Sequence, residues 1–254
     1  MRIVIITQNE PFYLASNLSY LIEVLPKHSS IVGCVVLDAS PFEKKESFLG
    51  KAKRTYSVFG VPFFLHYSLK FLASKLSKSK KISFVLEKNN IPEILLDQPI
   101  NDKNSVAKIK FVKPDLLISI LGNQIFKAPI LNIAPKGCLN LHTALLPKYR
   151  GLMPTFWVLK NQEKQTGVSV FFVDEGIDSG PIVVQEKVDI GQKTQEELIL
   201  LTKKIGMESI SKAVDLIEKN KVVLIENDNS KMTYNSFPTK EDVKIFRENG
   251  SRFF

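Results

Sequence analysis

Short runs of β-branched and other apolar residues alternate along this chain with stretches of helical periodicity, and this alternation limits the possible folds more than any other feature. Residues 2–7 form one such run, and residues 31–37 form the next. Between them, apolar residues recur at helical spacing from about Leu14 to Leu25. A strand, a helix and a second strand at this spacing predict a βαβ unit and therefore an open α/β sheet.

The same alternation returns after residue 81 and extends the predicted sheet. A capping box of Thr194 and Glu197 predicts the start of a long helix that ends near Asn220. Thr239 predicts the cap of a second helix at about 240–248. We expect the remaining helices at 82–88 and 105–112, and the remaining strands at 93–96, 116–121, 137–142 and 168–173. The whole pattern predicts a Rossmann-like open, mostly parallel sheet with helices on both faces.

The size and composition suit a soluble protein with a sizeable core, since 44% of the 254 residues are hydrophobic and 24% are charged. We expect a main domain over 1–220 and a short extension over 221–254. The first residues enter a strand pattern without the features of a signal peptide, which predicts a cytoplasmic protein. Cys34 and Cys138 lie in apolar, strand-like runs. They predict buried thiols rather than a disulfide framework or a zinc site.

The first strand-to-helix turn argues against a dinucleotide cofactor. Residues 8–11 read QNEP and contain no glycine, whereas a dinucleotide-binding turn needs glycines so that its backbone approaches the pyrophosphate. A metal site is not expected either, because His28 and His66 have no Cys, Asp or Glu at ligand spacing.

Polar side chains with useful chemistry gather between residues 140 and 180. Asn140 and His142 lie two residues apart in a predicted strand, so they project to the same side. Asp178 follows in a glycine-flanked loop that is able to fold back over them. In open α/β sheets ligands bind beyond the carboxyl ends of the strands, where this pattern places Asn140 and His142. Each residue alone is more typical of a structural role, but together they predict a site that moves a one-carbon acyl group.

Formyl transfer to an amine makes two demands on such a site. The oxyanion of the tetrahedral intermediate needs fixed hydrogen-bond donors, and losing one donor typically costs roughly 3–4 kcal/mol of barrier. The attacking amine must also lose a proton. Asn140 and a donating His142 suit the first task. Asp178 suits the second, by holding the His142 ring or by relaying the proton through a water.

Residues 140–151, which read NLHTALLPKYRG, resemble the signature of the 10-formyltetrahydrofolate-dependent formyltransferases. That family includes glycinamide ribonucleotide transformylase, methionyl-tRNA formyltransferase and the sugar N-formyltransferases. Asp178 stands where these proteins have their catalytic aspartate. One departure is Thr143-Ala144, where the family often has a serine before the two leucines. The resemblance extends from about Leu116 to Leu216.

The resemblance implies a formyltransferase catalytic domain over 1–220, with 10-formyltetrahydrofolate as co-substrate and no metal. It implies that Asn140, His142 and Asp178 are the catalytic residues. Arg150 and Tyr149, at the mouth of the site, are candidates for binding substrate. The residues implied to contact the folate are Leu121, Gly122, Asn123, Leu145, Leu146, Val173, Asp174, Glu175, Gly176 and Ile177.

Elimination among the known members of the family favours one class of amine as the acceptor of the formyl group. Methionyl-tRNA formyltransferases carry a C-terminal barrel, and only about 35 residues follow the long helix. Glycinamide ribonucleotide transformylases are shorter before the Asn140–His142 motif. We therefore favour a nucleotide-linked amino sugar, with methionyl-tRNA as the alternative. A formyltetrahydrofolate hydrolase and a non-catalytic RNA- or membrane-binding derivative are further alternatives, and a homodimer is one option for assembly.

Residues 41–81 form a basic, aromatic-rich insertion that the motif does not explain. Between Ser47 and Val85 the chain has eight Lys or Arg residues and no Asp or Glu, and without these eight charges the net charge of +9 would fall to +1. The favoured interpretation is a helical insertion that packs its aromatic residues on the core. The alternatives are contact with tRNA and peripheral association with a membrane surface. Pro62, His66 and Lys70 interrupt the apolar run, so it is too short to cross a bilayer.

Overall fold

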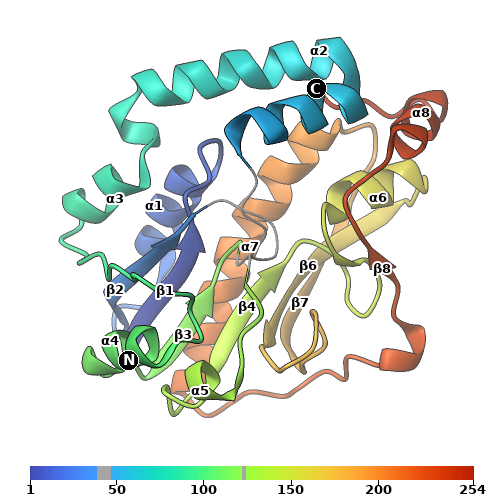
Figure 1. The fold of residues 1–254 in the computed structure, drawn as a ribbon. Helices are drawn as coiled ribbons and strands as arrows, with labels where there is room; N and C mark the ends of the chain where they lie inside the picture. The colour runs from blue at the N-terminus through green and yellow to red at the C-terminus, as the bar shows by residue number, and fades with distance from the viewer. Residues whose placement is uncertain (39–46, 122–123) are drawn as a thin grey trace.

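A six-stranded sheet forms the centre of the computed structural model, which describes residues 1–38, 47–121 and 124–254 (Figure 1). Its strand order is β2-β1-β3-β4-β6-β7. The first four strands are parallel, and β6 and β7 are antiparallel to their neighbours. The strands are β1 (Arg2–Gln8), β2 (Ser30–Leu37), β3 (Leu116–Ser119), β4 (Cys138–His142), β6 (Gln165–Phe172) and β7 (Ile182–Asp189). This arrangement confirms the predicted mostly parallel α/β sheet.

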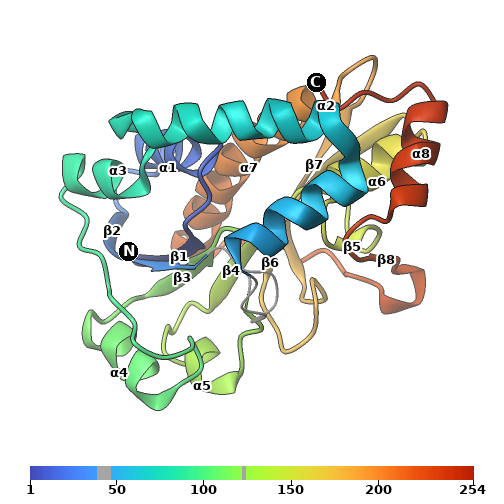
Figure 2. The same cartoon turned by 45° about the horizontal axis from the view of Figure 1, so that its top comes forward.

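Helices cover both faces of the sheet, as Figure 2 shows. On one face lie α1 (Leu14–Val24), α3 (Ile82–Lys88) and α7 (Gln195–Glu218), and on the other lie α4 (Lys103–Phe111) and α5 (Ala128–Leu131). Successive side chains of β1 point to opposite faces of the sheet, and each face has its own hydrophobic core. Ile3 and Ile5 pack in the core under α1, α3 and α7, and Val4 and Ile6 pack in the core under α4 and α5. The predicted capping box of Thr194 and Glu197 opens α7.

Two predicted strands differ from the structure. Residues 93–96 form no strand and make one isolated bridge, from Glu93 to Cys34 at the edge of β2. Leu95 is 68% exposed there, and Ile94 and Leu96 are only partly buried against the core, so little burial is gained by extending the pairing. The predicted strand at 116–121 is shorter and ends at Ser119. The structure also contains β7 and a small parallel pair, β5 (Arg150–Gly151) with β8 (Tyr234–Asn235), which the sequence pattern did not predict.

The basic insertion is helical, as predicted. Its described part is α2 (Phe48–Leu76), followed by a short 3-10 helix, η2 (Lys78–Lys80). A kink divides α2 at Gly60, where φ is +79°. Glycine adopts this conformation without steric cost, and Pro62 removes a backbone donor two residues later. The two halves of α2 therefore fold back on each other over one face of the molecule (Figure 2).

The predicted extension shares a core with the rest of the chain. Helix α8 (Lys240–Glu248) begins at Thr239, as expected, and η3 (Asn229–Lys231) precedes it. Phe246 and Phe253 stack on each other and pack with Phe156 of α6 (Pro154–Lys160) and Phe59 of α2. Trp157 belongs to the same cluster and is 9% exposed.

Both thiols are buried, which confirms the expectation for Cys34 and Cys138. Within the described ranges, no helix has the length and apolar character needed to cross a membrane.

Candidate active site

Strand β4 carries Asn140 and His142 to the carboxyl edge of the parallel strands. Asn140 pairs with Ser119 of β3 and with Phe171 of β6, so it lies near the point where the sheet changes from parallel to antiparallel. His142 is buried, with 6% of its surface exposed. The side-chain oxygen of Asn140 is also buried and has no hydrogen-bond partner. A buried polar atom without a partner costs free energy in the unliganded protein, so this amide is suited to a ligand.

The imidazole of His142 is held between a backbone carbonyl and a carboxylate. Nε2 lies 2.7 Å from the carbonyl oxygen of Tyr149 and donates its hydrogen there. Nδ1 lies 3.6 Å from Oδ2 of Asp178. The same carboxylate oxygen accepts a hydrogen bond from the backbone N–H of Gly151 at 2.9 Å. The ring orientation is therefore fixed, and Nδ1 is the nitrogen left for proton exchange.

The loop that carries Asp178 is held from both sides. Asp178 has φ of +49°, a left-handed conformation that non-glycine residues seldom adopt. Asn227, from the C-terminal segment, donates 2.9 Å hydrogen bonds from its amide to the carbonyl oxygens of Asp178 and Gly180. A Cβ on Gly180 would lie 1.8 Å from the carbonyl oxygen of Phe172, so only glycine fits. These contacts place the carboxylate against His142.

A cavity of about 280 Å³ opens beside these three residues. Five residues implied to contact folate line it together with the catalytic candidates: Leu121, Val173, Asp174, Gly176 and Ile177. Asp174 orders the loop, since its carboxylate accepts hydrogen bonds from the Gly176 N–H at 3.0 Å and the Ser179 hydroxyl at 2.6 Å. Glu175 is exposed and does not line the cavity. Gly122 and Asn123 lie outside the described residues.

Leu145 and Leu146 also lie away from the cavity and pack against the sheet. Leu146 is 4% exposed in a small core with Phe171 and Ile182. Leu145 contacts the backbone at Gly167, where an added Cβ would lie 2.4 Å from its side chain. Their contacts are therefore structural in this conformation.

Arg150 and Tyr149, which the sequence suggested as substrate contacts, do not line the cavity. Arg150 is 5% exposed, and its guanidinium donates 2.8 Å hydrogen bonds to the amide oxygens of Asn227 and Asn229. The hydroxyl of Tyr149 donates to Glu163. Both residues support the site indirectly, because Asn227 holds the Asp178 loop and the Tyr149 carbonyl holds His142.

The structure adds polar residues that the sequence analysis did not select. Gln8, Asn17, Gln124 and Lys203 line the cavity. Gln8 ends β1, so the rule that ligands bind beyond the carboxyl ends of the strands would have found it. Lys203 lies in the middle of α7, where neither motif nor spacing distinguishes it from a solvated helix residue.

Lys203 is the sole Lys or Arg among the described residues that line the cavity. Burial lowers the pKa of its ammonium, and the charge of Glu10 partly opposes this effect. The Glu10 carboxylate is already engaged, since it accepts hydrogen bonds from the backbone N–H groups of Phe12, Tyr13 and Leu14. The Lys203 side chain is half-buried, its ammonium lies 5.8 Å from the centroid of the Tyr13 ring, and its charge suits an anionic ligand.

In the part of the chain that the structure describes, no group of three or more His, Cys, Asp or Glu side chains is placed to hold a metal ion. The polar groups that line the cavity include four side-chain amides, the His142 imidazole, the carboxylates of Asp174 and Asp178, and the Lys203 ammonium.

The fold and the site place this chain in a class of α/β proteins. Proteins of this class have an open, mostly parallel sheet and bind small ligands beyond the carboxyl ends of its strands. The chain belongs to the formyl transferase family, whose profile matches residues 70–214. This confirms the family resemblance of the motif that begins at Asn140.

The similarity extends to curated proteins and to solved structures. The chain is 37% identical over 158 residues to a methionyl-tRNA formyltransferase of Alkaliphilus oremlandii, covering 62% of this chain and 51% of that protein. It is 33% identical to the methionyl-tRNA formyltransferase of Thermodesulfovibrio yellowstonii, covering 76% of this chain and 69% of that protein. The chain thus spans about half the length of the first relative.

The fold also matches an N-formyltransferase from Helicobacter canadensis, solved with folinic acid and dTDP-3-aminofucose. The TM-score is 0.56 with 18% sequence identity, and the match covers 92% of this chain and 70% of that one.

Proposed function

We propose that this chain is an N-formyltransferase that moves the formyl group of 10-formyltetrahydrofolate to a primary amine, with a nucleotide-linked amino sugar as the favoured acceptor. One observation carries the proposal: Asn140 and the His142–Asp178 pair line the same cavity. An oxyanion donor next to an acid–base pair is what acyl transfer to an amine requires.

Each residue has a separate task in the proposed reaction. The neutral amine attacks the formyl carbon, a carbon–nitrogen bond forms, and negative charge develops on the formyl oxygen. Asn140 donates its amide hydrogen to that oxygen, and His142, protonated on both ring nitrogens, donates through Nδ1, because its Nε2–H is bound to the Tyr149 carbonyl. Asp178 accepts the proton that the amine loses, directly or through a water. The oxyanion then collapses, the bond to N10 of the folate breaks, and tetrahydrofolate leaves with the proton that Asp178 had accepted, passed on directly or through a water.

Two groups of lining residues suit different substrates. The loops after β3 and β6 contribute Leu121, Gln124, Val173 and Ile177, which offer backbone groups and mostly apolar contacts for a folate pterin. β1, α1 and α7 contribute Gln8, Asn17 and Lys203. We assign these three residues to the acceptor, since the Lys203 ammonium suits a phosphate and the two amides suit sugar hydroxyls.

Methionyl-tRNA is the second candidate acceptor. It is favoured by the relatives described above, which are methionyl-tRNA formyltransferases and are more similar in sequence to this chain than the sugar enzyme is. The Lys203 ammonium suits either acceptor equally, because a nucleotide-linked sugar and a tRNA both carry phosphates.

The test is an assay of tetrahydrofolate release from 10-formyltetrahydrofolate with a panel of acceptors. The panel holds nucleotide-linked 3- and 4-amino sugars, methionyl-tRNA, glycinamide ribonucleotide and buffer alone. Release that depends on an amino sugar supports the favoured acceptor, and release that depends on methionyl-tRNA supports the second. Release in buffer alone would identify a hydrolase, and folate binding without release in any reaction would favour a non-catalytic derivative.

A further inference from the structure

The second half of α2 exposes a continuous apolar stripe to solvent. Its members recur at intervals of four, four, three and four residues and therefore lie on one side of the helix. They are Val61, Leu65, Leu69, Leu72 and Leu76, which are 50%, 56%, 67%, 58% and 88% exposed. No polar residue interrupts the stripe. Isolated exposed apolar residues are ordinary, but four leucines and a valine along one helix face mark an interaction surface.

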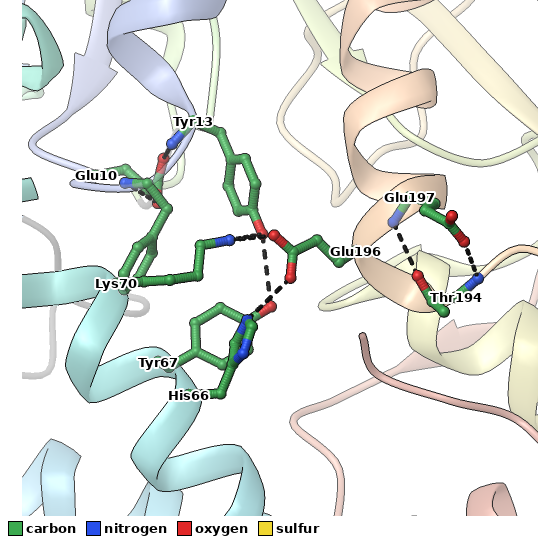
Figure 3. Close-up of polar contacts among 9 residues, drawn as sticks. Glu10, Tyr13, His66, Tyr67, Lys70, Thr194, Glu196 and Glu197 are labelled. Atoms are coloured by element: carbon green, nitrogen blue, oxygen red, sulfur yellow. Dashed lines mark hydrogen bonds and ion pairs between the residues drawn. The ribbon is translucent and has the colours of Figure 1, made fainter. Parts of the chain in front are cut away.

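The opposite side of α2 is fixed to the body of the protein, so the stripe cannot turn inward. Phe63 is buried there, between Phe59 and Phe253. Lys70 and His66 both bind the carboxylate of Glu196 in the first turn of α7, with His66 Nε2 3.1 Å from Oε2 (Figure 3). This ion pair and the aromatic contacts set the rotation of α2 about its axis.

Exposed lysines follow the stripe at its C-terminal end. Lys75, Lys78, Lys80 and Lys81 are all exposed, within and just after the last turn of α2. The whole segment from Ser47 to Val85 contains no Asp or Glu. The stripe and the lysines together form what we call the outer face of α2, and the helix runs along one side of the molecule (Figure 1).

The positive charge beside the stripe distinguishes between two possible partners, a second copy of the chain and a membrane surface. A second copy of the chain would cover the leucines, but its own α2 offers no carboxylate to the four lysines. A bilayer with anionic headgroups satisfies both parts, since aliphatic side chains enter the acyl boundary while lysines bind phosphates.

We infer that the outer face of α2 binds the surface of an anionic phospholipid membrane, with the helix lying in the plane of the interface. The inference does not depend on the proposed formyl transfer, because none of the residues involved lines the cavity.

The experiment is co-sedimentation of the full chain with two kinds of vesicle: phosphatidylcholine alone, and phosphatidylcholine with about one third phosphatidylglycerol. We expect binding to the anionic vesicles only, weakened by salt. A stripe variant, Leu65→Ser with Leu69→Ser and Leu72→Ser, should lose at least about tenfold in affinity. A charge variant, with Lys75, Lys78, Lys80 and Lys81 each changed to Gln, should lose a similar factor.

The matched control replaces three apolar residues elsewhere that are at least as exposed: Leu95→Ser, Phe111→Ser and Val223→Ser, at positions that are 68%, 84% and 81% exposed. Its binding should equal that of the unmodified chain, and thermal unfolding should confirm that all variants are folded. Absence of binding to anionic vesicles overturns the inference, as does binding that survives in the stripe variant. A dimer in light scattering that the stripe variant abolishes, without lipid binding, would also overturn it and assign the stripe to self-association.

Discussion

Oδ2 of Asp178 lies 3.6 Å from Nδ1 of His142 and also accepts the backbone N–H of Gly151. The contact brings together the end of β4 and a loop beyond β6, and the loop is itself held by Asn227 of the C-terminal segment. Three distant parts of the chain thus position one carboxylate. The arrangement fixes which nitrogen of His142 exchanges a proton, and it makes the site sensitive to single substitutions.

The substitution Asp178→Asn should lower kcat by about 10²- to 10⁴-fold, because the amide cannot accept the proton that the amine loses. Its near-identical shape keeps the contact with Gly151, so the melting temperature should change little. Steady-state kinetics with the acceptor found in the panel would measure the effect. Near-normal turnover would contradict the role proposed for Asp178.

The substitution Asn140→Ala removes the proposed oxyanion donor and should lower kcat by roughly 10²- to 10³-fold, with little change in the KM for folate. Asn132→Ala, at an exposed position, serves as the control and should leave both constants unchanged. A rise in KM without a fall in kcat would assign Asn140 to substrate binding instead.

The substitution Lys203→Met should raise the KM for a phosphate-bearing acceptor by about 10- to 100-fold, because a hydrogen bond to a charged group is lost inside the cavity. The KM for 10-formyltetrahydrofolate should stay constant, and Lys203→Arg should restore part of the affinity. If the folate KM rises in place of the acceptor KM, the ammonium contacts the folate.

The glycine at position 180 can be tested against a second glycine that has free space around it. Gly180→Ala should destabilise the protein by about 2–3 kcal/mol, since its Cβ would lie 1.8 Å from the Phe172 carbonyl oxygen. Gly250→Ala should cost only about 1 kcal/mol, because φ is +77° there but no atom lies within 4 Å. Urea unfolding measures both, and equal costs would contradict this account of the Asp178 loop.

Acid should weaken the attachment of α2 to α7 through Glu196. Burial alone would raise the pKa of this carboxyl, but hydrogen bonds and charge from Lys70 and His66 outweigh it and lower the pKa. A lowered pKa contributes stability that is present above the unfolded value of about 4.3 and is lost as the pH falls through the folded value.

In the Lys70→Met variant the pKa of Glu196 should rise toward or above its unfolded value, so the part of the acid-induced loss of stability that Glu196 contributes should shrink or disappear. Lys53→Met, at an exposed position of the same helix, is the control. Melting curves between about pH 3 and 6 measure the difference. If the melting temperatures of the two variants fell equally with acid, the role of the ion pair would be contradicted.

Local patterns in the sequence determined much of the fold. Apolar runs predicted β1, β2 and β4, and capping residues predicted where α7 and α8 begin. Both signals are local, because hydrophobic periodicity and hydrogen bonds to the first turn of a helix act over a few residues. The N-x-H spacing also put Asn140 and His142 on one side of a strand, since successive side chains alternate in direction. The family followed from the same short motif.

Only the tertiary structure decided which of the selected residues face the cavity. Arg150 and Leu146 sit in the family motif, yet one binds the C-terminal segment and the other packs in a small core. Lys203 and Asn227 carry no local signal, and they reach the site because α7 and the chain after it fold back over the sheet. Such contacts depend on how distant segments pack, and no spacing within a single segment encodes them.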